Sequence, residues 1–461
     1  MLGRGSYDPV VSNGEVDPLT RVEKALDARG PTRMSPGHSR IHDLLGLLGD
    51  PHRAYPSIHL TGTNGKTSTT RMIDTLLGGL GLRTGRYISP HLESITERIA
   101  IDGQPLSNER FAEVYDEIEP FVDIVDGRHD PGVSYFEVVT AMAFAAFADA
   151  PVDVAVVEVG LGGRFDTTNV LHAPVAVITP ISLDHTQVLG STVAEIAADK
   201  AGIVYDGATL VTAQQPPEAA EVLLRRAVEV GATVAREGME FGVVHRSVAV
   251  GGQLLTLQGL AERYDDVFLP LHGAHQAGNA ACALAAVEAF LGVGAREPLA
   301  ADIVRDAFAS VESPGRLEVL RRGPTVIVDG AHNPAGADVL VAGLQEAFAF
   351  RRIVGVVAVL GDKDVAGILA ALEPLLAEVV VTQNSSPRAM PVDDLAALAA
   401  EVFGEDRVTV ASRLDEAIDE AIRLAEDDPS LVGDAGVGVL VTGSIVTVGE
   451  ARRLLRPTLG R

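Results

Sequence analysis

A glycine-rich stretch at residues 58–71, IHLTGTNGKTSTTR, has the residue types that bind nucleotide phosphates. It departs from the commonest phosphate loop, G-x-x-x-x-G-K-[ST], because Leu60 stands where that pattern has its first glycine. Two glycines still permit a tight turn with N–H groups aimed at an anion, and Lys66 can neutralise the β- and γ-phosphates. The alternative is an ordinary glycine turn into a helix. The predicted ATP-binding residues are Gly62, Thr63, Asn64, Gly65, Lys66, Thr67 and Ser68.

Two further side chains follow apolar runs and suggest a metal site. Glu158 lies near the end of the run VDVAVVEVG, and a lone buried carboxylate costs several kcal/mol unless it is paired or binds a metal. Ligands of α/β sheets bind at the carboxyl ends of the strands. Glu158 is therefore a candidate Mg²⁺ ligand, with an ion pair to Arg164 as the alternative. His185 follows the next run, and the spacing alone leaves a metal ligand and a structural histidine equally open.

Four other polar residues stand where a ligand could bind. Lys200 ends a helix opened by the capping box Thr192-x-x-Glu195, and the residues alone favour an ordinary helical lysine in an ion pair. Asn279 is expected at the start of a helix, as a reader of adenine or as a helix cap. The run TVIVDGAHNPAG ends a strand with Asp329 and adds His332 before a proline-started helix. Polar groups at strand ends in two separate regions predict a site in the cleft between two domains.

The elements that position these residues follow from an alternation of short Val- and Ile-rich runs with longer helical stretches. Runs that are apolar on both faces, at residues 57–62, 152–160, 174–182 and 208–213, predict parallel strands covered by helices. A cleaner second α/β pattern begins near residue 325, and residues 240–272 predict a small antiparallel appendage. We expect a flexible N-terminus over 1–20, an ATP-binding domain over 21–313 and a Rossmann-like domain over 314–461, divided at Ser313-Pro314-Gly315.

The composition of the chain argues against some classes of binding partner. A net charge of −26 argues against a general nucleic-acid surface, which needs a basic stripe, but leaves room for a local phosphate pocket. The N-terminus lacks the apolar core of a signal peptide, and the run VVTAMAFAAFA is too short to span a bilayer. Cys282, the single cysteine, is expected in the core. These features predict a cytoplasmic protein without membrane or nucleic-acid partners, and we expect a monomer.

Ten strings across residues 35–455 resemble, in the same order, the folylpolyglutamate synthase/dihydrofolate synthase family of the Mur ligase superfamily. They are TGTNGKTS, YISPHL, SYFEVVTAMAF, EVGLGGRFDTTN, SLDHTQVLG, ADKAGI, HGAHQAGNA, SPGRLE, DGAHNP and VTGSIVTVGEAR. The first string alone indicates only the superfamily. The resemblance implies an N-terminal P-loop ATPase-like parallel-sheet domain of Mur ligase type and a C-terminal Rossmann-like glutamate-ligase domain.

The resemblance also implies the chemistry. The expected reaction adds L-glutamate to dihydropteroate, or to the γ-carboxylate of folates, through an acyl phosphate formed with ATP. A cell-wall Mur-type ligase acting on a UDP-sugar peptide and a P-loop regulatory ATPase are the alternatives. One departure concerns the phosphate loop, where Thr67 replaces a glycine found in many relatives, so Thr67 and Ser68 compete for the metal contact.

The resemblance also implies roles for individual residues. Two Mg²⁺ ions are expected, and Lys200 matches a lysine that relatives carboxylate with CO₂. The implied metal ligands are Ser89, Glu158, His185 and Lys200; the further ATP contacts are Asn279, Arg316 and Asp329; the pterin-side residues are Phe136, Phe165 and Asp166; and the cleft residues of the C-terminal domain are His332 and Ser444. Lys66, Lys200 and His332 are the expected catalytic residues, with His332 or Asp329 assisting proton removal.

Overall fold

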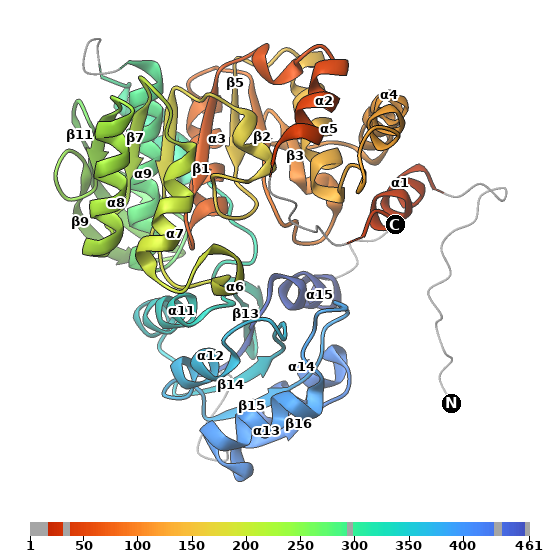
Figure 1. Cartoon of the computed structure of the whole chain (residues 1–461). Helices are drawn as coiled ribbons and strands as arrows, with labels where there is room; N and C mark the ends of the chain where they lie inside the picture. The colour runs from red at the N-terminus through yellow and green to blue at the C-terminus, as the bar shows by residue number, and fades with distance from the viewer. Residues whose placement is uncertain (1–16, 31–36, 293–297, 428–435, 457–461) are drawn as a thin grey trace.

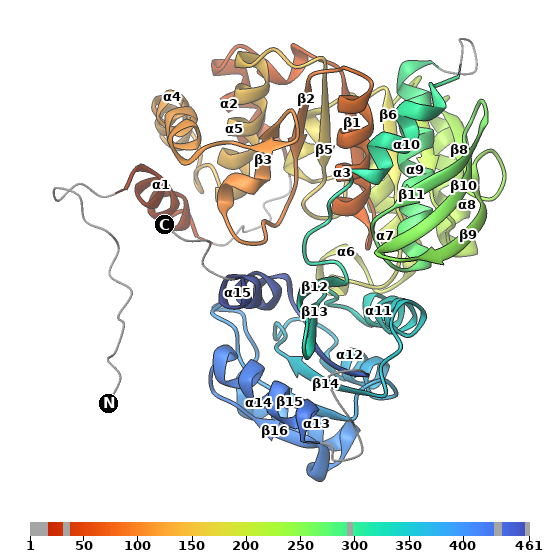
Figure 2. The same cartoon turned by 180° about the vertical axis from the view of Figure 1, so that it is seen from behind.

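The chain folds into two α/β bodies, one above the other in Figure 1 and seen from behind in Figure 2. The computed structural model describes residues 17–30, 37–292, 298–427 and 436–456. The first body runs from helix α1 (Pro18–Asp27) to helix α10 (Ala301–Ala309), and the second from strand β12 (Glu318–Arg321) to helix α15 (Ile445–Leu455). Residues 18–20, expected to be flexible, are helical, while residues 1–16 of that expected segment lie outside the described residues.

An eight-stranded sheet in the order β4-β3-β2-β5-β1-β6-β7-β8 forms the centre of the first body. The run from β2 to β8 is parallel, and β3 and β4 add an antiparallel edge. Every residue of β1, β2, β5 and β6 is buried, which is why β5 and β6 read as nearly continuous apolar runs. The bounds are β1 (Ser57–Thr61), β2 (Thr84–Tyr87), β3 (Ile99–Ile101), β4 (Gln104–Pro105), β5 (Val154–Glu158), β6 (Val175–Ile178), β7 (Thr209–Thr212) and β8 (Thr233–Arg236).

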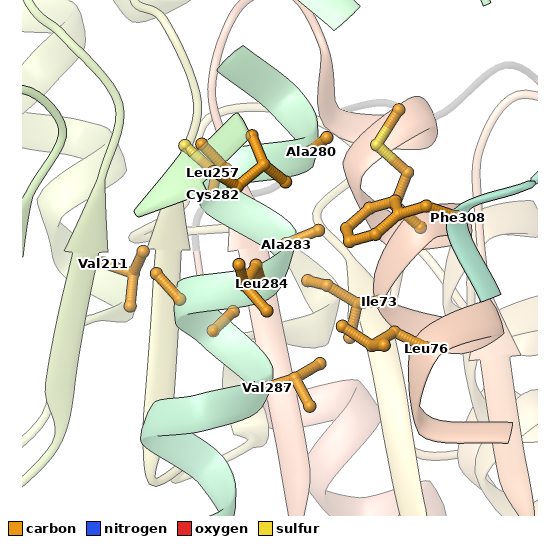
Figure 3. Close-up of a cluster of buried hydrophobic side chains, with 14 of the residues drawn as sticks. Ile73, Leu76, Val211, Leu257, Ala280, Cys282, Ala283, Leu284, Val287 and Phe308 are labelled. Carbon is orange, nitrogen blue, oxygen red and sulfur yellow. The ribbon is translucent and has the colours of Figure 1, made fainter. Parts of the chain in front are cut away.

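Helices cover both faces of this sheet. Figure 3 shows one side, where Ile73 and Leu76 of α3 meet Ala283, Leu284 and Val287 of α9. Cys282 is buried there, as expected. The remaining helices of the first body are α2 (Ser39–Leu47), α3 (Lys66–Gly79), α4 (Asn108–Asp126), α5 (Tyr135–Asp149), α6 (Thr186–Leu189), α7 (Val193–Lys200), α8 (Pro217–Glu229) and α9 (Ala274–Leu291), with short 3₁₀ turns η1 (Pro51–Arg53), η2 (Ile95–Arg98), η3 (Thr167–Val170) and η4 (Ala201–Ile203).

The antiparallel appendage expected over residues 240–272 is confirmed. Strands β9 (Gly242–Ala249), β10 (Gly252–Gln258) and β11 (Arg263–Leu269) form a sheet in the order β11-β10-β9. Leu255, Leu257 and Val267 belong to the same buried cluster as α9. The appendage thus completes the core on the side of the sheet where α9 lies.

The second body is the expected doubly wound unit. Its six-stranded sheet has the order β12-β13-β17-β14-β15-β16, with β12 antiparallel at one edge and the others parallel. Separate apolar clusters lie on the two faces. Its other elements are β13 (Thr325–Val328), β14 (Arg352–Val357), β15 (Glu378–Val381), β16 (Val408–Val410), β17 (Val437–Thr442), α11 (Pro334–Ala347), α12 (Val365–Leu372), α13 (Val392–Phe403), η5 (Glu405–Arg407) and α14 (Leu414–Glu426). Among the described residues, none of the helices is both long and apolar enough to cross a membrane.

A buried histidine in the turn η1, just before β1, makes stability depend on pH. His52 is 4% exposed, packs 5.9 Å from the Phe144 ring, and has no hydrogen-bond partner for either ring nitrogen among the described residues. Burial lowers the pKa of His52 to about 4 from the usual 6.5, against an opposing influence of Asp50. Protonation at acidic pH therefore favours the unfolded chain.

We expect His52 to destabilise the fold as pH falls from 6.5 towards 4, because only the unfolded state then binds its proton. Its contribution to stability is fully present above pH 6.5. Denaturant unfolding of His52→Phe at several pH values should show a slope of stability against pH that is smaller by up to one proton in this window. The exposed His42 is the matched control, and an unchanged slope in His52→Phe would contradict the expectation.

Candidate active site

The glycine-rich loop connects β1 to α3, as the sequence predicts, and it is tightly wound. Gly62 and Gly65 have φ angles of 151° and 88°, values that side chains disfavour. Lys66 Nζ donates to the carbonyl oxygens of Gly62 at 3.0 Å and Thr63 at 3.1 Å, so the ammonium closes over its own loop. Burial lowers the pKa of Lys66. The loop is therefore a preformed cradle with a cation at its centre.

Asn279 reaches this loop from α9. A Cβ at Gly65 would stand only 2.6 Å from Asn279 Oδ1, so glycine is needed for the approach. The sequence placed Asn279 at a helix start, but α9 begins at Ala274 and Asn279 lies one turn further in. The helix-cap alternative is therefore wrong, and the amide is held against the loop.

Glu158 ends β5 beside the first turn of α3. Both of its carboxylate oxygens lie 3.0 Å from Thr67 Oγ1, and the residue is 1% exposed. Burial raises the pKa of Glu158 to about 7, although Lys66 opposes this. The alternative pairing with Arg164 is wrong: within the described ranges no ion pair joins the two residues, and the Arg164 guanidinium lies 5.4 Å from the Phe165 ring. Glu158 is a buried carboxylate turned towards the loop.

Lys200 also lies on the loop. It ends α7, which begins with the predicted capping box, and it is 3% exposed. Its Nζ donates to Gly62 O at 2.9 Å, the same carbonyl that Lys66 contacts. Burial and then Lys66 lower the pKa of Lys200 to about 7. The ordinary helical ion pair favoured by the residues alone is therefore wrong, because this lysine is buried beside a second cation.

A hydrogen-bond network joins the loop to the second body. Asn64 and Asn333 exchange hydrogen bonds at 3.2 and 3.1 Å, and Asn333 Nδ2 also donates to Asp184 at 3.1 Å. Lys363 Nζ donates to Asp184 at 2.6 Å and lies 3.2 Å from His185 Nε2. The network brings groups from both bodies to one place.

The charges in this network fix its protonation. Although burial opposes it, the Lys363 ammonium holds the pKa of Asp184 well below its usual range. Burial and Lys363 lower the pKa of His185 to about 4, so its Nε2 is a lone-pair donor at neutral pH. His185 has a φ of 50°, which is uncommon outside glycine and marks a constrained position. A neutral imidazole is the form that binds metals.

Three predicted residues, Arg316, Asp329 and His332, lie where the chain enters the second body. His332 Nε2 lies 3.7 Å from Asp184 and its Nδ1 lies 2.9 Å from Gly330 O. Asp329 accepts from the backbone N–H groups of Leu317 at 2.9 Å and Ala331 at 2.8 Å, so its carboxylate organises the loops. Arg316 packs against Gly330, because a Cβ added at Gly330 would stand only 3.0 Å from Arg316 Nη1.

The other predicted residues make no hydrogen bond to this centre among the described residues. Phe136 lies 6.0 Å from the Tyr87 ring, and Phe165 is 52% exposed. Asp166 is buried and accepts from Thr168 Oγ1 at 2.6 Å, and Ser444 caps α15 by accepting from Val446 N at 3.0 Å. Ser89 is buried in the loop after β2. The ligand contacts of these five residues stay predictions.

Sequence reasoning missed four members of the site, one of which is Asn333 between the two bodies. Asp184 directly precedes His185, and Lys363 follows β14 in the string GDKD, so both had the strand-end signal used for Glu158. Ser313 was treated only as a hinge, yet its Oγ lies 2.9 Å from Ser68 Oγ. The pairing of Asp184 with Lys363 joins positions 179 residues apart, which a single sequence does not reveal.

The chain is similar to known proteins over most of its length. The profile of the Mur ligase, glutamate ligase domain matches residues 315–445. The Mycobacterium tuberculosis dihydrofolate synthase/folylpolyglutamate synthase is 56% identical over 459 residues, covering 95% of this chain and 94% of the relative. The Escherichia coli protein of that name is 34% identical over 421 residues, covering 91% of each.

Solved structures agree with these relatives. Mycobacterium tuberculosis folylpolyglutamate synthase complexed with ADP has a TM-score of 0.91 and 55% identity, covering 95% of this chain and 98% of that one. Escherichia coli FolC in complex with DHPP and ADP has a TM-score of 0.81 and 31% identity, covering 95% and 97%. These matches extend over both bodies and the cleft between them. The chain belongs to the dihydrofolate synthase/folylpolyglutamate synthase family of ligases.

Proposed function

We propose that the chain uses ATP to join L-glutamate to dihydropteroate, to the γ-carboxylate of reduced folates, or to both. The observation that carries the proposal is that groups of both bodies meet at the phosphate loop. Lys66 begins α3, Glu158 ends β5 beside it, and Asn333 of the second body reaches the same loop through Asn64. A ligase needs such an arrangement because the activated acid must meet an amine away from water.

The relatives support the folate substrate over the two alternatives. The proteins that match more than nine-tenths of this chain carry dihydrofolate synthase and folylpolyglutamate synthase names, and one solved neighbour holds DHPP together with ADP. A regulatory ATPase would not need a second body with groups such as Asn333 at the phosphate loop.

The reaction needs no nucleophile from the protein. A carboxylate oxygen of the acceptor forms a bond to the γ-phosphorus of ATP, and the bond to the β–γ bridging oxygen breaks to release ADP. The glutamate amine then attacks the acyl carbon, phosphate leaves and one proton is lost. Lys66 and the loop N–H groups stabilise the charge on the transferred phosphoryl group. His332 and Asp329 are our candidates for assisting the proton loss.

The donor set around Glu158 fits Mg²⁺, which prefers oxygen ligands. Glu158 is a buried carboxylate that is hydrogen-bonded only to a hydroxyl among the described residues, and His185 offers a neutral nitrogen. Although the described residues contain no ready-made group of three acidic, histidine or cysteine ligands, hydroxyls and a modified lysine complete the proposed set. Glu158, His185 and Ser89 would hold one ion, and Lys200 as a carbamate a second. Bound Mg²⁺ would neutralise phosphate charge.

Carboxylation of Lys200 is chemically favoured by its surroundings. CO₂ reacts with a neutral amine, and a pKa of about 7 leaves much of Lys200 neutral at pH 8. We expect protein equilibrated with ¹³C-bicarbonate at pH 8 to show a carbamate carbon signal by NMR. The signal should be absent in Lys200→Arg and retained in a variant of the exposed Lys24. A wild-type spectrum without the signal would contradict carboxylation.

The remaining roles divide between the two ends of the acceptor. Phe136, Phe165 and Asp166 are proposed for the pterin side, and His332 and Ser444 for the glutamate side. Because both halves of the cleft come from one chain, we propose a monomer that acts on small molecules in the cytoplasm.

A mass-spectrometric product assay tests the proposed substrates. Purified protein, ATP, Mg²⁺ and L-glutamate are incubated in parallel with dihydropteroate and with tetrahydrofolate. The proposal predicts a mass increase of one glutamyl residue on at least one acceptor. Transfer to a UDP-sugar peptide but to neither pterin would favour the cell-wall alternative.

A further inference from the structure

A loop of the first body, residues 88–94, is held by the last helix of the second body. The loop follows β2 and begins with Ile88 and Ser89, the latter a proposed metal ligand. Its far end is rigid, because the Glu97 carboxylate accepts from the backbone N–H groups of Leu92, Glu93 and Ser94 at 2.9–3.0 Å. Although burial opposes it, these hydrogen bonds lower the pKa of Glu97. Leu92, Glu93 and Ser94 are therefore tied to one side chain, so a shift of Glu93 also moves its neighbours.

Arg452 of α15 clasps this loop. The side chain is 3% exposed, and its guanidinium binds Glu93 of the first body and Glu318 of the second at the same time. Arg453 Nη1 donates to the Glu93 carbonyl at 3.2 Å, and Arg456 lies 3.6 Å from the Glu93 carboxylate. A planar guanidinium can serve two carboxylates in fixed directions, which a lysine cannot. The clasp thus defines a geometry as well as an attraction.

Close packing surrounds the clasp. Leu92 packs against the apolar cluster of the second body that contains Val448. Gly449 faces the loop so closely that a Cβ there would overlap the Leu92 carbonyl oxygen, and Gly315 leaves room for Leu92 and Val448. α15 lies on the side of the second body that faces the first (Figure 2). The helix can dock only if position 449 has no side chain.

We propose that Arg452 and Gly449 are positioning residues that couple docking of the second body to the placement of Ser89. The inference rests on the proposed function, in which Ser89 contributes to the metal and phosphate site. When α15 is seated, the loop from Ser89 to Glu93 is fixed at both ends. When α15 is displaced, Glu93 keeps its hydrogen bond to Glu97 but loses its contacts to Arg452, and the segment that carries Ser89, four residues away, is no longer held against the second body. Closure of the glutamate-binding body thereby completes the phosphate-transfer site.

The most direct variant is Gly449→Ala. Gly449 has no left-handed φ, and alanine is the better helix former, so the change favours α15 while its methyl group pushes the loop away. Gly46→Ala is the matched control, because Gly46 lies in α2 with nothing within 4 Å of its Cβ position. Arg452→Met and Arg452→Lys form the second series, and Met at the exposed Arg423 of α14 is their control.

Two readouts are taken from the same samples, kcat with the KM for ATP, and hydrogen exchange over residues 88–98. We expect Gly449→Ala and Arg452→Met to lower kcat about 10- to 100-fold, because a displacement of about 1 Å at a reacting group has effects of that size. The KM for ATP should change less than threefold, since the phosphate loop is untouched. Exchange over 88–98 should rise while exchange within α15 stays slow, and Arg452→Lys should recover only part of kcat.

The kinetic and exchange results can each contradict the inference. A kcat within twofold of wild type in both Gly449→Ala and Arg452→Met, or unchanged exchange over 88–98, would overturn the inference. Absence of any glutamyl product with the wild-type protein would refute the proposed function instead. The exchange measurement would then decide the clasp alone, because it does not depend on the reaction.

Discussion

Lys66→Met is expected to lower kcat/KM for ATP by roughly 10³-fold or more, since it removes the cation that we propose stabilises the transferred phosphoryl group. In the described structure Lys66 Nζ is held by Gly62 O and Thr63 O, so it lies at the centre of the loop before any phosphate arrives. Steady-state kinetics with ATP as the varied substrate measures the effect. Lys66→Arg should not restore it, because the larger planar group does not fit a cradle closed by two carbonyls.

The loss should occur without unfolding. Burial disfavours the charged form of Lys66, so a methionine of similar length relieves a cost in the folded state. Thermal unfolding should therefore give a melting temperature equal to or above that of wild type. Met at the exposed Lys24 is the matched control and should keep full activity. Activity within tenfold of wild type in Lys66→Met would rule out the assigned role.

Glu158→Gln is the second large effect, with opposite signs for activity and stability. The amide keeps the shape but removes the charge that would hold Mg²⁺ beside Thr67, so kcat should fall by roughly 10²- to 10³-fold. Product formation at saturating ATP and Mg²⁺ measures this. Gln at the exposed Glu401 of α13 is the control for loss of one negative charge.

The stability change follows from the raised pKa of Glu158. The folded value of about 7 exceeds the ordinary 4.5, so the folded state holds the proton more tightly, and this stability is present below pH 4.5 and lost as pH rises through 7. Without Mg²⁺, Glu158→Gln should be more stable than wild type at pH 8 and no more stable at pH 4.5. Chemical denaturation at the two pH values measures this, and equal differences at both would contradict the buried carboxylate.

Much of the fold could be predicted because its strands are buried on both faces. β5 consists of apolar residues until its last position, so Glu158 stood out as the exception. The glycine loop could also be predicted, since its two glycines and lysine are needed wherever the chain turns around an anion. The same physical signal, an alternation of apolar runs and helical stretches, identified the second body from about residue 325.

The rest of the site could not be predicted, because burial of a polar side chain depends on distant segments. Lys200 has the same local sequence whether its helix faces water or the phosphate loop. Asp184 becomes part of the site only through its contact with Lys363, which comes from the second body. Asn279 lies about one turn further into α9 than the sequence predicts. The helix starts after Gly273, a cap residue that makes no side-chain hydrogen bond and so gives little signal in the sequence. The resemblance to a family, not the residues alone, identified Lys200 as part of the site.

The most direct test of the account is whether ADP release depends on both acceptor substrates. ADP is measured with purified protein and ATP alone, with the pterin acceptor added, with glutamate added, and with both. The account predicts sustained ADP release only in the complete mixture, with one glutamyl amide formed per ADP. ADP release that is equally fast without acceptor or glutamate would contradict a ligase and indicate a free-standing ATPase.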